Sequence, residues 1–116
     1  MHEFSLVSSL MMLIEEQARL HNAKRVTKVV LGVGRFSGVE PDLLKLAFDT
    51  FKEKTICEDA ELVLEIEELT LRCRDCGKES VLRERPTKKC PSCGSLNTEF
   101  VAGRDLYLKS LELETD

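Results

Sequence analysis

Two Cys-x-x-Cys pairs place the strongest constraint on what this chain can fold into. The first pair is Cys73 and Cys76, and the second is Cys90 and Cys93. Each pair is followed directly by a glycine, which tolerates the positive φ that a tight turn needs. This spacing lets each pair present two thiolates to one tetrahedral ion. The sequence therefore predicts a zinc ribbon.

Two other chemistries use four cysteines. A pair of disulfide bonds would need an oxidising compartment, but the amino-terminal residues lack the basic start and apolar run of a secretory signal. A rubredoxin-like iron centre would use the same ligands, because the spacing does not specify the metal. Four thiolates leave no open coordination position, so we expect a structural rather than a catalytic site. The fifth cysteine, Cys57, matches no metal spacing, and we expect a buried free thiol.

Length and charge narrow the class of protein. The 116 residues fit one domain, or one small domain with a metal-stapled insert, and the longest apolar runs fall short of the ~18 residues of a membrane span. We expect a cytoplasmic protein with no membrane partner. Net charge is −4, but residues 70–104 carry +4 and the remainder −8. A bound zinc with four thiolates would lower the charge of that segment by about two. The segment is then not basic enough to indicate that the protein binds nucleic acid.

Apolar periodicity predicts two helices and three longer strands. Residues 4–20 repeat apolar positions at helical spacing, with Ser5 as the expected N-cap, and Pro41 suits the start of a second helix. Three segments have strand patterns: residues 25–33, 61–69 and 105–114. Phe100 and Val101 suggest a further short strand within the ribbon.

The last strand is longer than a ribbon needs, so we expect it to return to the first sheet. The predicted fold is therefore α+β, a small two-helix, three-stranded α/β domain with an inserted four-cysteine zinc ribbon. The first domain comprises residues 1–69 plus 105–116, and the ribbon comprises residues 70–104.

The second candidate site is His2. A histidine beside an initiator methionine is ordinarily an exposed residue without a role. A free amino terminus, however, can offer the Met1 amine, the His2 amide and the His2 imidazole within a short reach, and the Glu3 amide would complete a plane. Planar nitrogen-rich coordination is what Ni(II) and Cu(II) favour.

Several segments together resemble the HypA/HybF family of nickel metallochaperones. They are Met1-His2-Glu3, the early helix with Ser8 and Ser9, the segment from Gly32 to Gly34, residues 39–51, and the two Cys-x-x-Cys pairs. The resemblance implies a carrier without catalytic activity that helps to insert nickel into [NiFe] hydrogenase and, in some bacteria, urease. It also implies a nickel-binding α/β domain with an inserted zinc ribbon.

The resemblance implies that Met1, His2 and Glu3 bind nickel as cargo and that the four cysteines of the two pairs bind a structural zinc ion. Glu40 stands near the family's aspartate at the start of the second helix and is a further candidate ligand, with Asp42 two residues later. The implied partners are a hydrogenase-maturation GTPase of the HypB type, the hydrogenase large-subunit precursor and, for some members, urease accessory proteins. The chain would act as a monomer or weak homodimer.

Two other functions remain open on the sequence. A zinc-ribbon module that binds nucleic acid or another protein would explain the basic segment, although Phe100 is its only aromatic residue. A rubredoxin-like electron carrier would be coloured on purification. Nothing in the sequence pairs a nucleophile with a base, so an enzyme is not expected.

Overall fold

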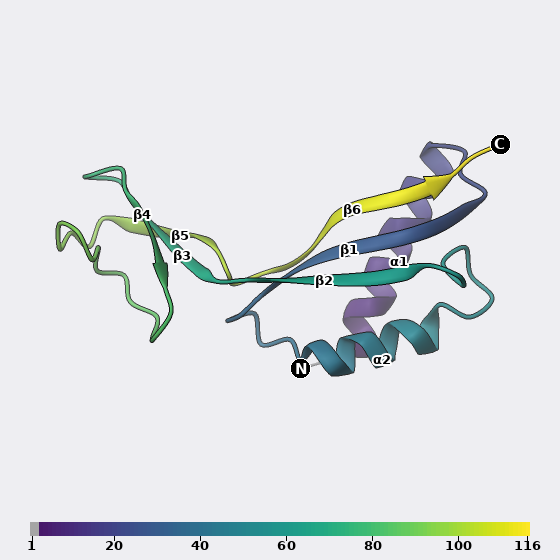
Figure 1. Ribbon diagram of the computed structural model, residues 1–116, viewed down its shortest axis with the longest axis horizontal. Coiled ribbons are helices and arrows are strands. Elements are labelled where there is room, and N and C mark those ends of the chain that lie inside the picture. The colour runs from purple at the N-terminus through teal and green to yellow at the C-terminus, as the bar shows by residue number, and fades with distance from the viewer. Residues whose placement is uncertain (1–2) are drawn as a thin grey trace.

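The computed structural model describes residues 3–116 and shows an elongated molecule of 53 × 28 × 17 Å (Figure 1). Two three-stranded sheets lie towards opposite ends of the long axis. The elements in chain order are α1 (Glu3–Leu20), β1 (Arg25–Gly34), α2 (Pro41–Phe51), β2 (Glu61–Glu67), β3 (Leu69–Cys73), β4 (Glu79–Leu82), β5 (Thr98–Ala102) and β6 (Leu106–Glu114). Neither described helix is long and apolar enough to cross a membrane.

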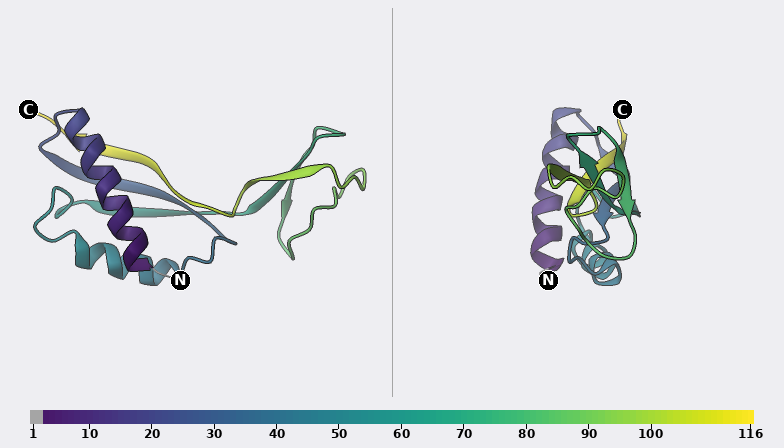
Figure 2. Two further views of the ribbon diagram at one scale, coloured as in Figure 1. Left: turned by 180° about the vertical axis from the view of Figure 1, so that it is seen from behind. Right: turned by 90° about the vertical axis from the view of Figure 1, so that its left-hand side faces the viewer.

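The first sheet has the order β2-β1-β6. β1 is parallel to β2, with α2 in the connection between them, and antiparallel to β6. Both helices lie on one face of this sheet (Figure 2). Their apolar stripes and the inward residues of β1 form one core cluster, which includes Ile14, Leu31 and Leu44. The prediction of a two-helix, three-stranded α/β unit in which the last strand returns to the first sheet is confirmed.

The helix starts agree with the prediction in one case and not in the other. Pro41 is the first residue of α2, and Glu40 before it has an extended backbone, as expected for an N-cap position. Ser5, by contrast, lies inside α1, which already includes Glu3. The predicted N-cap is therefore wrong. Glu3 suits the first turn because its carboxylate faces the positive end of the helix dipole.

The second sheet has the order β4-β3-β5 and a small core of Leu69, Leu71 and Leu82, with Phe100 packed against it. The single strand predicted over residues 61–69 is two strands, because the first sheet ends at Glu67 and the second begins at Leu69. β5 extends the short strand predicted at Phe100 and Val101. Residues 69–102 thus interrupt the chain between β2 and β6. Whether they fold independently stays a prediction.

A narrow neck joins the two sheets, formed by residues 34–36, 67–69 and 103–105 (Figure 1). The backbone N–H of Phe36 donates to the Gly103 carbonyl at 2.9 Å, and the N–H of Arg35 donates to the Glu67 carbonyl at 2.9 Å. The Arg35 guanidinium also binds the Glu68 carboxylate: Arg35 Nε lies 2.8 Å and Arg35 Nη2 2.7 Å from Glu68 Oε2. This pairing lowers the pKa of Glu68. The neck is therefore hydrogen-bonded across all three segments.

Candidate metal centre

The two cysteine pairs sit on turns with the same backbone geometry. In the first turn, Gly77 N–H donates to the Cys73 carbonyl at 2.9 Å, and in the second, Gly94 N–H donates to the Cys90 carbonyl at 2.9 Å. The two glycines have φ of +75° and +76°, which explains the residue type at both positions. Each turn is a knuckle that aims two sulfur atoms the same way. β3 leads into the first knuckle, and β5 follows the second.

The four sulfur atoms converge on one point. All four Sγ atoms lie within 4.8 Å of one another, with 3.6 Å between Cys73 and Cys93 and 3.7 Å between Cys76 and Cys90. A tetrahedral zinc ion with Zn–S bonds near 2.3 Å separates its sulfur ligands by about 3.8 Å. The arrangement therefore fits a four-thiolate zinc ion. The cysteines are free thiols, so these residues are not paired as disulfides.

The knuckle backbone favours thiolates at the two buried cysteines. The N–H of Cys76 points at Cys73 Sγ from 3.5 Å, and this hydrogen bond lowers the pKa of Cys73. The N–H of Cys93 has the same effect on Cys90, whose pKa falls to about 6. A metal ion has to displace any proton from its cysteine ligands. The knuckles thus prepare these two sulfurs for metal binding.

A polar network ties the first knuckle to the chain that follows the second. Asp75 accepts a hydrogen bond from Ser95 Oγ at 2.5 Å and another from Asn97 Nδ2 at 3.1 Å. The Asn97 N–H in turn donates to Ser95 Oγ at 3.0 Å. These residues were not predicted as part of the site. Nothing in the sequence pairs Asp75 with residues 95 and 97, because the pairing depends on how the knuckles face each other.

The predicted nickel ligands are described only in part. Met1 and His2 lie outside the described residues. Glu3 is buried, and its Oε2 accepts a hydrogen bond of 3.1 Å from the backbone N–H of Glu40. The structure therefore brings Glu3 and Glu40 together at the start of α2, which lies apart from the second sheet that leads into the cysteine turns (Figure 1). The Glu40 and Asp42 side chains are exposed.

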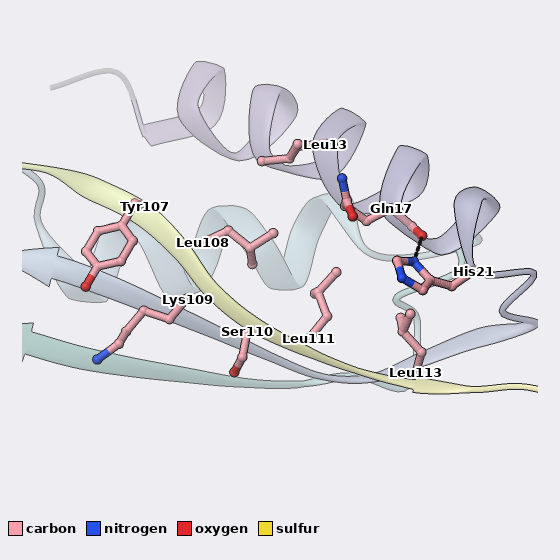
Figure 3. Close-up of a pocket in the computed structure, with 9 residues that line it drawn as sticks. All are labelled: Leu13, Gln17, His21, Tyr107, Leu108, Lys109, Ser110, Leu111 and Leu113. Carbon is pink, nitrogen blue, oxygen red and sulfur yellow. Dashed lines mark hydrogen bonds between the residues drawn. The ribbon is translucent and has the colours of Figure 1, made fainter.

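The remaining features near the first sheet do not resemble a metal site. An open groove of about 690 Å³ lies between α1 and β6 and is largely apolar (Figure 3). Its histidine, His21, points its Nδ1 at the Gln17 carbonyl from 2.9 Å. Cys57 is fully buried in the first core, and this burial raises its pKa to about 11. Among residues 3–116, only the four cysteines group three or more ligating side chains.

An α+β fold whose second sheet carries four convergent cysteines defines a metal-binding protein of the zinc-ribbon-bearing class. The model of the family described as "Hydrogenase/urease nickel incorporation, metallochaperone, hypA" matches residues 1–113. The chain belongs to this HypA family of nickel metallochaperones, which serve hydrogenase and urease maturation. Its members are maturation factors and not enzymes, as predicted.

Individual relatives match over the whole chain. The hydrogenase maturation factor HypA of Aquifex aeolicus (strain VF5) is 60% identical over 116 residues, which cover 100% of both chains. The hydrogenase maturation factor HypA of Wolinella succinogenes is 43% identical over 116 residues, which cover 100% of this chain and 98% of that protein. The solution structure of the Ni metallochaperone HypA from Helicobacter pylori has a TM-score of 0.77 at 36% identity and is covered to 100%, as is this chain. The resemblance stated from the sequence is confirmed.

Proposed function

We propose that this chain carries Ni(II) on its amino terminus and holds a structural Zn(II) ion with Cys73, Cys76, Cys90 and Cys93. The nickel ligands are the Met1 amine, the amides of His2 and Glu3, and the His2 imidazole. Nitrogen donors in a plane suit Ni(II), and four thiolates in a tetrahedron suit Zn(II).

The observation that carries this proposal is the closure of the cysteine centre. Four convergent sulfurs fill the coordination sphere of one ion, and two of them are buried. Such a site retains its metal, whereas a carrier needs a site that exchanges it. No second group of three ligating side chains occurs among residues 3–116. A cargo site built from the chain end and its backbone nitrogens satisfies both requirements.

The contact between Glu3 and Glu40 supports the further proposal that a carboxylate takes part in the nickel site. Because the Glu40 N–H binds the Glu3 side chain at 3.1 Å, the start of α2 lies next to the residue that follows His2. This contact supports the exposed Glu40 carboxylate as a candidate for an additional nickel ligand. Its negative charge also favours a divalent cation at close range.

Delivery follows from the family's role. We infer that the chain passes nickel to the hydrogenase large-subunit precursor with the help of a GTPase of the HypB type. In a cell that makes urease, the accessory proteins of that enzyme are a second set of partners. We infer a cytoplasmic location, which suits these partners and keeps thiols reduced so that they can bind zinc.

The test is a calorimetric titration of nickel into untagged protein with a native amino terminus, which measures the nickel affinity. His2→Ala removes the imidazole ligand. We expect nickel affinity to fall by at least about tenfold, because even the loss of a group that only orients a ligand has an effect of about this size. His21→Ala is the matched control, because His21 is the only other histidine and lies at the end of α1. It should bind nickel as the wild type does.

An added residue before Met1 gives an independent check. It converts the terminal amine into an amide and shifts the ligand order, so nickel binding should fall while zinc content, measured by mass spectrometry, stays at one ion per chain. Unchanged nickel affinity in both His2→Ala and the extended protein would show that the cargo site lies elsewhere.

A further inference from the structure

The second sheet carries cationic side chains that its own carboxylates do not neutralise. Glu79 and Glu99 pair with Arg72 and Arg74, with the shortest contact, from Arg74 Nη2 to Glu99 Oε2, at 2.8 Å. Six other cations of this region form no ion pair with any residue in the described range 3–116. They are Lys78, Arg83, Arg85, Lys88, Lys89 and Arg104.

Arg104 lines an apolar pocket beside the neck, and Lys88 lies over the ring of Phe100, which lines the same pocket. The pocket has a volume of about 270 Å³ and is lined by Phe36, Leu69, Pro86, Phe100 and Arg104. We call it the neck pocket. Lys88 Nζ lies 5.3 Å from the centroid of the Phe100 ring, and Arg104 Cζ lies 5.2 Å from it.

Segments from both ends of the molecule build the neck pocket. Phe36 belongs to the turn after β1, whereas Pro86 belongs to the loop between β4 and the second knuckle. Phe36 is 41% exposed, although it is a large apolar side chain held on a hydrogen-bonded turn. The pocket thus has an apolar floor with Arg104 in its wall and Lys88 over one of its rings, and neither cation has a carboxylate partner among residues 3–116. A ligand that matches it has an apolar group beside negative charge.

We propose that the neck pocket docks an acidic segment of a partner protein, which places one apolar side chain against Phe36 and Phe100 and its carboxylates near Lys88 and Arg104. We choose an acidic partner for its charge complementarity, because carboxylates would supply the ion pairs that these cations lack within the described range 3–116. Exposed aromatic and arginine side chains are also the residue types that contribute most at protein interfaces. The proposal rests on the proposed function only in that a carrier has to dock in order to deliver.

The charge of the rest of the molecule favours a short acidic peptide over a nucleic acid. Residues outside 70–104 carry a net charge of −8, and the neck pocket borders them through Phe36. A long polyanion that crossed the neck would be repelled by this charge, whereas a short acidic segment can end at the pocket.

The test uses zinc-loaded full-length protein and an array of short synthetic peptides that range from strongly acidic to strongly basic, each with and without one leucine. A single-stranded RNA of similar length is included. Fluorescence anisotropy then gives the dissociation constant of the best peptide. The test variant is Lys88→Glu combined with Arg104→Glu. The matched control, Lys45→Glu combined with Lys78→Glu, has the same charge change on exposed residues that neither line the pocket nor lie over the Phe100 ring.

Acidic peptides that contain leucine should bind best, and the Lys88/Arg104 variant should bind them at least about tenfold more weakly. The control variant should stay within about twofold of the wild type. Absence of peptide binding, a preference for RNA or basic peptides, or equal weakening in both variants would overturn the proposal. Zinc content and nickel affinity are measured on every protein, so a failed nickel site with intact peptide binding would count against the proposed function alone.

Discussion

At the scale of single residues, Asp75 shows how one side chain couples the two halves of the metal centre. It stands between Cys73 and Cys76 and binds Ser95 and Asn97, which follow the second knuckle. These hydrogen bonds also lower its pKa, so it stays charged in neutral solution. A carboxylate that cross-links two knuckles limits how far their sulfurs can separate. Groups of this kind behind the ligands commonly tune metal affinity.

We expect Asp75→Ala to speed the loss of zinc to a chromogenic chelator by about tenfold, because the knuckles can then move apart. Glu84→Ala is the control, since Glu84 is an exposed acid of the same region and forms no ion pair among residues 3–116. It should release zinc at the wild-type rate. If Asp75→Ala released zinc no faster than Glu84→Ala, the proposed role of the Asp75 hydrogen bonds would be wrong.

At the scale of elements, the neck depends on close backbone approach. Gly103 has φ +97°, and a Cβ at this position would overlap the backbone of Leu69 and Glu68. A Cβ on Gly34 would likewise overlap the Gly103 backbone. The strands can therefore pass from one sheet to the other only where two side chains are absent.

Gly103→Ala should lower the free energy of unfolding by about 2–4 kcal/mol, through left-handed strain of about 1–2 kcal/mol and the clash with Leu69. Gly77→Ala is an informative comparison, because Gly77 has φ +75° but nothing within 4 Å of an added Cβ. Gly77→Ala should therefore lower the free energy of unfolding only by the left-handed strain. Urea unfolding followed by circular dichroism measures both losses, and a Gly103→Ala loss no larger than that of Gly77→Ala would contradict the steric account.

The elements that were predicted correctly have long periodic patterns. Val7, Met11, Ile14 and Ala18 mark α1, and alternation marks β2 and β6. β3 and β4 were not predicted separately because they are short and lie beside the knuckles, where the cysteine spacing dominates the pattern. The break at Glu68 depends on its pairing with Arg35, which is distant in sequence. The convergence of the four sulfurs could be anticipated from spacing, whereas the Asp75 network and the neck pocket arise only from tertiary register.

At the scale of the whole molecule, the two sheets differ in what holds them together. The first has a core of thirteen buried residues, whereas the second has three, with Phe100 beside them. So small an apolar cluster cannot offset the entropy of ordering more than thirty residues. The second sheet should depend on its metal, which can supply on the order of 10 kcal/mol.

Removal of zinc by a strong chelator at neutral pH should therefore abolish amide exchange protection in β3 and β5 and leave that of β1 between Val26 and Val33 largely intact. Hydrogen exchange with mass spectrometry resolves the two regions. The experiment also tests the division of the chain at residues 70 and 104. Simultaneous loss of protection in both sheets would mean that the chain is one cooperative unit, and reloading with zinc controls for damage by the chelator.

The insertion of residues 69–102 between β2 and β6 also bears on the order of folding. β1 and β6 pair although Val29 and Leu111 are far apart in sequence, so closing that loop is entropically costly. Once the four cysteines share an ion, β3 and β5 are held side by side, and Leu69 and Gly103 come into contact at the neck. The chain that remains between β1 and β6 is then effectively much shorter. Metal binding in the second sheet should therefore lower the entropic cost of pairing β1 with β6 in the first sheet.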